Sequence, residues 1–144
     1  MPKRNSLLCA LFLIILLSSC SNSLKERVEG DWYINEMDYS DRNITNNLLS
    51  NGMTLYVHDS CFLPSIYVVD NHTINEKGTW KVFKQGSDTM IEFITTNQIM
   101  RGLFKIKRTW MEPDKIGGGL NVWMILVSDK LKIKCYKVPT ATLF

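Results

Sequence analysis

Apolar and polar residues alternate with a period of two through most of this chain from Gly30 onward, and helical periodicity is nearly absent. Such alternation is typical of strands with one buried face. Clusters of Gly, Asp, Asn and Pro separate the alternating segments and indicate tight turns. Seven or eight short strands in about 110 residues favour an all-β sandwich or barrel over a parallel sheet with crossover helices. The expected strands cover residues 30–37, 53–59, 78–83, 89–95, 103–110, 121–128 and 130–137.

Within most of these segments, the large apolar side chains occupy every second position and therefore point to the same face of the strand. This pattern predicts which residues face the interior. Arg108 has the parity of its apolar neighbours, so we expect it on the apolar face, where a guanidinium needs a partner such as an aromatic ring. The expected inward set is Trp32, Leu55, Trp80, Phe93, Phe104 and Trp110.

Two segments depart from simple alternation. The stretch "NITNNLLSNG" is expected to form a short helix that Thr45 could cap and Gly52 could end. The stretch "NVWMILVS" is apolar on both parities. One of its sides can fill the interior, and the other needs to be covered by the short helix or by a partner.

The N-terminus carries an export signal. Lys3 and Arg4 precede an apolar run over residues 7–17, which is shorter than the roughly 20 residues that a membrane-spanning helix needs. Its length is typical of a secretory signal peptide. The following Leu17, Ser18, Ser19 and Cys20 resemble the lipobox of bacterial lipoproteins. The resemblance implies cleavage before Cys20 and acylation of that residue, which would anchor the chain in a membrane.

This interpretation divides the chain into four parts. Residues 1–20 form the signal peptide, 21–28 a tether, 29–138 one folded domain and 139–144 a tail. Ser21 stands where lipoproteins retained in the inner membrane typically carry aspartate, so we expect the outer membrane of a bacterial envelope, with the leaflet left open. The alternative is a free secreted protein in which Cys20 is incidental.

Net charge bears on the expected partners, and the cysteines bear on a possible disulfide. The formal net charge of +3 falls to +1 once Lys3 and Arg4 are removed with the signal peptide. A nucleic-acid-binding domain would carry a strongly basic patch, so nucleic acid is not an expected partner. Cys61 and Cys135 remain in an oxidising compartment. They form either a disulfide or two buried thiols, and the sequence leaves both alternatives open.

Short motifs give the domain a family resemblance. Gly30-Asp31-Trp32 is similar to the G-x-W motif that opens the first strand of lipocalins, and Gly78-Thr79-Trp80 nearly repeats it. With the ending "LVSDKLKIKCYK", residues 29–138 resemble the small lipocalin-like lipoproteins of Bacteroidetes. The resemblance implies an antiparallel up-and-down β-barrel of about eight strands.

The resemblance also assigns a role to the first tryptophan. In lipocalins this residue plugs the closed end of the barrel, and a basic residue from the last strand packs over it. Trp32 fits the first role, and Lys137 has the position and parity for the second. Arg108 is the competing candidate.

We find no motif for catalysis or for a cofactor. His58, Asp59 and Cys61 are types that bind zinc, but neighbouring strand residues point to opposite faces. Glu36 and Asp38 are better explained as a solvated rim than as a catalytic carboxylate pair. The expected function is therefore non-enzymatic binding of a small apolar ligand in the lumen. The alternative is a protein-interaction module with a packed lumen, such as an envelope inhibitor or an accessory subunit of an outer-membrane uptake complex.

Overall fold

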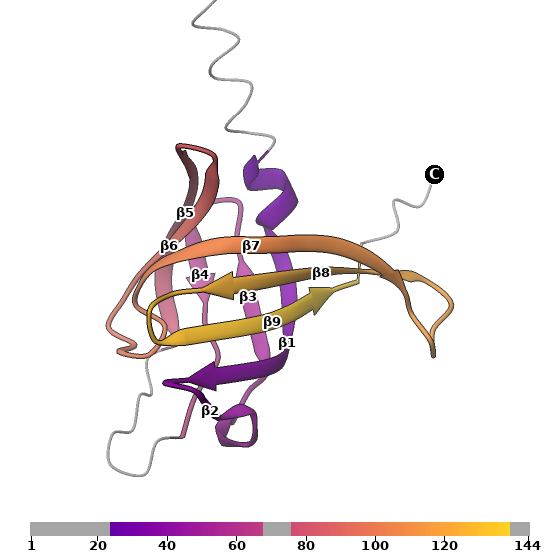
Figure 1. Cartoon of the computed structure of the whole chain (residues 1–144), viewed down its shortest axis with the longest axis horizontal. Helices are drawn as coiled ribbons and strands as arrows, with labels where there is room; N and C mark the ends of the chain where they lie inside the picture. The colour runs from indigo at the N-terminus through magenta and orange to yellow at the C-terminus, as the bar shows by residue number, and fades with distance from the viewer. Residues whose placement is uncertain (1–23, 68–75, 139–144) are drawn as a thin grey trace, which may run out of the picture.

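A computed structural model describes residues 24–67 and 76–138, and these form an antiparallel barrel (Figure 1). Its strands are β1 (Gly30–Tyr39), β2 (Arg42–Asn43), β3 (Gly52–Leu55), β4 (Ser60–Phe62), β5 (Lys77–Gln85), β6 (Asp88–Thr95), β7 (Gly102–Pro113), β8 (Leu120–Val127) and β9 (Leu131–Lys137).

The sheet closes on itself because its first long strand pairs with its last. The order is β2-β1-β3-β4-β5-β6-β7-β8-β9, and β1 pairs additionally with β9, from Tyr33↔Tyr136 to Tyr39↔Leu131. The two-residue β2 only extends one end of β1, so eight strands make the barrel wall. The predicted all-β, up-and-down, lipocalin-like barrel is thus confirmed.

Bulky side chains fill the interior. Five of the six residues predicted to point inward are at most 2% exposed: Trp32, Leu55, Trp80, Phe93 and Phe104. Buried Met37, Met53 and Met124 pack among them. Leu63, Ile66 and Met100 lie in connections between strands and are buried as well. The barrel therefore has a packed core rather than an open lumen.

The sixth residue, Trp110, and its neighbour Arg108 lie on the outer face, contrary to the prediction. The register of β7 against β8 shifts between Ile106 and Arg108, which is a β-bulge. A bulge inserts one extra residue, here Lys107, and so reverses the parity of every residue after it. Phe104 points into the core, whereas Arg108 is exposed and Trp110 only partly buried.

Helical structure also differs from the prediction. The segment after β2 forms only one 3-10 turn, η1 (Thr45–Asn47), and the Thr45 hydroxyl accepts a bond from the Met37 N–H (2.9 Å) rather than capping the turn. Residues 24–28, which fall within the expected tether, are helical, and Val28 is buried. Among the described residues, no helix is long and apolar enough to span a membrane.

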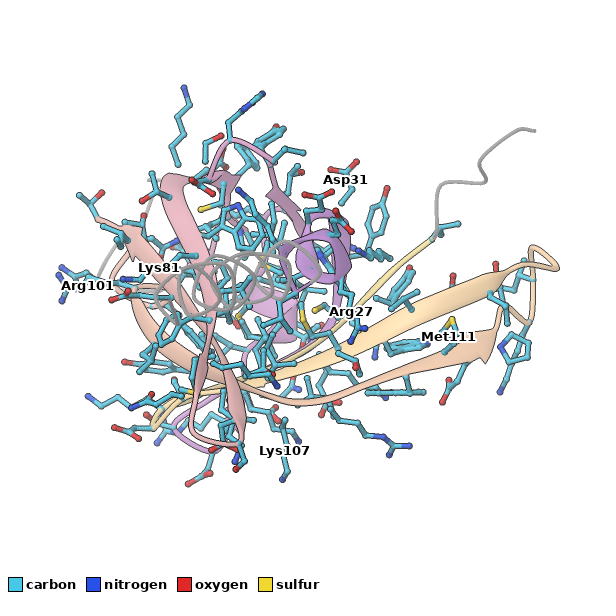
Figure 2. All side chains as sticks on the ribbon, turned by 90° about the horizontal axis from the view of Figure 1, so that it is seen from above. Arg27, Asp31, Lys81, Arg101, Lys107 and Met111 are labelled. Carbon is cyan, nitrogen blue, oxygen red and sulfur yellow. The ribbon has the colours of Figure 1, made fainter. Side chains whose placement is uncertain are left out.

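Strands β7 and β8 pair with each other over a longer stretch than either pairs with its other neighbour. Pairing of β6 with β7 ends at Lys105, and pairing of β9 with β8 begins at Val122. Residues 106–121, which we call the arm, form a two-stranded hairpin. Its β7 strand has no β6 partner, and residues 112–121 extend past the last β8–β9 pair and project from the barrel wall (Figures 1 and 2). Met111 lies far along this arm.

Candidate functional site

The closed end of the barrel is built around Trp32. Its indole Nε1 donates to the Val28 carbonyl (2.7 Å), and the Lys137 ammonium lies 4.8 Å from the centre of a Trp32 ring. The same ammonium donates to the carbonyls of Arg27 (2.9 Å) and Glu29 (2.6 Å). Lys137 thus ties the helical residues 24–28 to the last strand.

Burial lowers the pKa of Lys137, and the nearby Glu29 carboxylate partly opposes that effect. The ammonium is held by a ring face and two carbonyl oxygens, which favour its charged form. Both hydrogen bonds of the Lys137 ammonium go to backbone carbonyls, so what the geometry shows for this group is a structural contact between residues 27–29 and β9.

Trp80, the second tryptophan buried in the core, is also held by a hydrogen bond from its ring nitrogen. Trp80 donates from Nε1 to the Tyr56 carbonyl (3.0 Å), and the Lys25 ammonium lies 5.9 Å from the centre of its ring. Phe104 packs edge-on against Phe93, with ring centres 5.6 Å apart.

Cys61 and Cys135 are two free, buried thiols, which is the second of the alternatives that the sequence allows. They lie on β4 and β9, which are separated in the wall by β3 and β1. Burial raises the pKa of Cys61 to about 11 and also raises that of Cys135. Thiols with such pKa values are poor nucleophiles near neutral pH.

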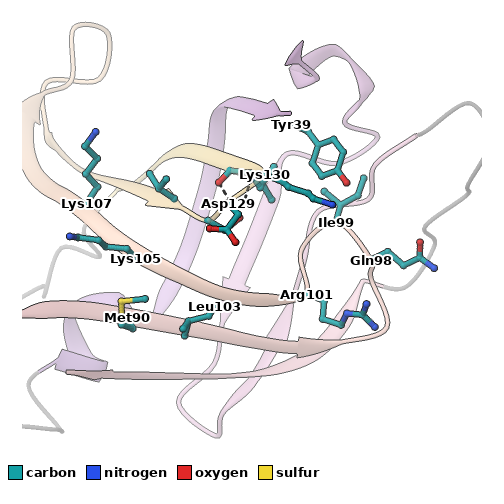
Figure 3. Close-up of a pocket in the computed structure, with 13 residues that line it drawn as sticks. Tyr39, Met90, Gln98, Ile99, Arg101, Leu103, Lys105, Lys107, Asp129 and Lys130 are labelled. Carbon is teal, nitrogen blue, oxygen red and sulfur yellow. Dashed lines mark hydrogen bonds between the residues drawn. The ribbon is translucent and has the colours of Figure 1, made fainter. Parts of the chain in front are cut away.

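A groove of about 750 Å³ opens at the other end of the barrel (Figure 3). Three connections form it: Tyr39 ends β1, residues 98–101 link β6 to β7, and residues 128–130 link β8 to β9. The groove continues over the outer surface of β7. It is therefore a surface site and is separate from the packed core.

Positive charge dominates the groove. Four cationic side chains line it, and Asp129 is the one acid among the lining residues. Lys105 is paired with Asp88 at 2.8 Å. The cations are Arg101, Lys105, Lys107 and Lys130, and in Figure 3 the two lysines of β7 lie at one end and Arg101 at the other.

Apolar side chains lie between these cations. Met90, Ile99, Leu103 and Val127 line the groove together with the Tyr39 ring. Leu103 is 42% exposed, so its side chain is accessible to a ligand. The groove therefore offers both charge and apolar surface to a ligand.

A buried asparagine shapes one side of the groove. The Asn97 side-chain oxygen accepts from the backbone N–H groups of Ile99 and Met100, both at 3.1 Å. The Arg101 N–H donates to the Asn97 carbonyl (2.9 Å). These bonds fix the β6–β7 connection and hold Ile99 and Arg101 at the rim.

The acids that the sequence places near a rim line a second, smaller groove of about 540 Å³. Glu36 and Asp38 both contribute to it. The Asp38 carboxylate accepts from the Asn43 side chain (3.0 Å) and lies 3.9 Å from the Lys132 ammonium, so it already has partners. In the described residues, no three His, Cys, Asp or Glu side chains gather as a metal site.

An aromatic row on the outer face escaped the sequence-based reasoning. Trp110, Trp123, Tyr136 and Tyr33 lie directly opposite one another on four successive strands. Their neighbouring ring centres are 5.8, 5.0 and 5.7 Å apart. Within this row, Trp123 of "NVWMILVS" packs between the Trp110 and Tyr136 rings, so aromatic side chains of neighbouring strands cover part of the face that the short helix was expected to cover. The strand register, which the sequence does not show, is what aligns the rings.

Comparisons of the chain with protein-family models, with curated proteins and with solved structures each found no match.

Proposed function

We propose that this protein is a lipid-anchored, non-enzymatic binding protein of the bacterial cell envelope, and that it binds at the outside of its barrel. The packed core supports an external site, because a barrel of eight strands holds either side chains or one small ligand. The observation that carries the proposal is the groove at the open end, which combines four cations with exposed apolar side chains.

This combination favours an anionic amphiphile as the ligand. A carboxylate or phosphate would interact with Arg101 and Lys107, for which no ion pair is found among the described residues. An aliphatic chain would cover Leu103 and Val127, whose burial contributes about 25 cal/mol per Å². A volume of about 750 Å³ is in the usual range for a small-molecule site.

The anchor supports an orientation for this groove. Cys20 precedes Leu24, the first described residue, by four positions, and four residues span at most about 14 Å. Acyl chains on Cys20 would therefore hold the closed end of the barrel near the bilayer. The groove lies at the opposite end and would face away from the membrane.

The groove is tested by thermal unfolding of the chain from residue 21 onward, with dodecanoate and with dodecanol as the uncharged counterpart. At ten times its dissociation constant, a ligand stabilises the folded state by about 1.4 kcal/mol. We expect dodecanoate to raise Tm by about 6 °C. Dodecanol should have a much smaller effect.

Replacement of two groove cations in Arg101→Gln/Lys107→Gln should abolish the shift. The matched control is Lys84→Gln/Lys115→Gln, which removes two exposed cations outside the groove and should keep it. An equal shift with dodecanol, or a full shift in the groove variant, would show that the cations do not recognise the ligand.

A second candidate function is the protein-interaction module, and the arm is the observation that favours it. Ile116 at its tip is 98% exposed, and Met111 and Leu120 on its two strands are 66% and 50% exposed. A photo-crosslinker in place of Ile116, expressed in the native host, should capture an envelope protein if this function is correct. The same crosslinker at Lys84 is the control.

A further inference from the structure

The outer edge of β7 has no strand beside it along the arm. Pairing with β6 ends at Lys105, and β6 itself begins at Asp88, too late to reach residues 108–113 of β7. In the described part of the chain, these residues pair only with β8. Such an edge presents backbone N–H and C=O groups that can pair with another strand.

The usable part of this edge is short and has a defined centre. The bulge at Lys107 limits it on one side, and Pro113, which has no backbone N–H, limits it on the other. Residues 108–112 remain between them, with Trp110 in the middle.

Two opposite charges lie at equal distances from that centre. Arg108 and Glu112 are both exposed and lie on the same outer face as Trp110. They are about 13 Å apart along the strand, too far to pair with each other. Neither forms an ion pair with any described residue. Arg108 stacks over the Trp110 ring at 4.8 Å, and Glu112 accepts the Trp110 Nε1–H (2.7 Å).

We propose that this edge pairs antiparallel with the same edge of a second copy of the chain, about a two-fold axis at Trp110. In this register each Arg108 lies opposite Glu112 of the other copy, so that two ion pairs form at once. A contact of one patch with itself is the common form of a symmetric dimer. The two aromatic rows then meet at Trp110 and continue across both sheets.

The charges of Arg108 and Glu112 favour a second copy of the chain as the partner, in this antiparallel register. Parallel pairing would place Arg108 against Arg108, and like charges directly opposite each other are destabilising. A shift of two residues would leave both ion pairs unmade. An unrelated strand would satisfy the edge only if it happened to carry the opposite charges at the same spacing.

Charge reversal tests the proposal in the full-length chain. Two copies with different C-terminal tags are expressed together in the native host and solubilised in mild detergent, and one tag is used to recover the other. We expect wild type to co-purify with wild type. Recovery should fall roughly tenfold when both copies carry Arg108→Glu, or when both carry Glu112→Arg, because each ion pair becomes a repulsion.

Co-expression of the two variants shows whether a loss of recovery comes from the lost contact between copies or from misfolding of the variant. A copy with Arg108→Glu and a copy with Glu112→Arg have complementary edges, so their recovery should return to the wild-type level. Lys84→Glu, a charge reversal on β5 away from both the arm and the groove, should leave recovery unchanged. No recovery for the wild type, no loss in the single reversals, or no restoration in the mixed pair would each overturn the proposal.

Discussion

Removing the positive charge of Lys137 should open the closed end of the barrel. The variant Lys137→Met keeps a flexible apolar side chain of similar length but loses the ammonium. That ammonium donates to two carbonyls, at 2.9 and 2.6 Å, and lies over Trp32 at 4.8 Å.

Each hydrogen bond from a charged group contributes about 1.5–3 kcal/mol, and a partly desolvated cation–π contact about 1–2 kcal/mol. The cost of removing the ammonium from water offsets a few kcal/mol of this stabilisation. We therefore expect the free energy of unfolding to fall by about 2–3 kcal/mol, which lowers Tm by about 8–12 °C in a domain of this size.

The measurement is urea unfolding of the chain from residue 21 onward, followed by tryptophan fluorescence. Lys132→Met is the matched control, because Lys132 lies on the same strand with its side chain 52% exposed and 3.9 Å from Asp38. An exposed pair of this kind contributes at most about 1 kcal/mol. If Lys137→Met were no less stable than Lys132→Met, the charge of Lys137 would not be what holds residues 24–28 to β9.

Three further outcomes are expected. Gly78→Ala should lower the unfolding free energy by about 2 kcal/mol, because a Cβ there would lie 2.7 Å from the Ile94 carbonyl oxygen; Gly52→Ala, which meets nothing closer than 3.8 Å, should change it little. Stability should decline as pH rises from 9 to 11, because the unfolded chain releases thiol protons that the folded chain retains; Cys61→Ala should flatten that slope by up to about 1.4 kcal/mol per pH unit in urea titrations. Cys20→Ser should abolish incorporation of radiolabelled palmitate and move the protein into the aqueous phase of a detergent partition; a wild type that took up no label would indicate an ordinary secretory signal.

Local patterning was sufficient to predict the barrel. Alternation places Trp32 and Trp80 correctly in the core. In β1 the pairing with β9 shifts between Ile34 and Glu36, but this irregularity follows Trp32 and changes the parity only of later residues such as the buried Met37. In β7 the same reasoning fails at a single residue. Phe104, Ile106, Arg108 and Trp110 alternate without interruption in the sequence, and nothing in that pattern marks the extra residue at Lys107.

The groove and the aromatic row depend on long-range pairing. Arg101 and Lys130 lie in separate connections and meet only after the barrel closes. Tyr33 and Tyr136 become neighbours only through the β1–β9 register. One indication of the groove was present in the sequence. Lys105 and Lys107 alternate with the apolar residues of β7, which predicts that they lie on the outer face, and both are exposed.

Pairing of β1 with β9 also sets the order of events during folding. Partners such as Tyr33 and Tyr136 are separated by nearly the whole domain, and contacts of such long sequence separation are typical of proteins that fold in milliseconds to seconds. Until residues 131–137 are in place, β1 and β8 each expose an unpaired edge beside a large apolar face. A chain that ends before β9 would keep both edges open and would be prone to aggregation. The last seven-residue strand therefore determines whether the chain forms a closed barrel or an open sheet with two unpaired edges.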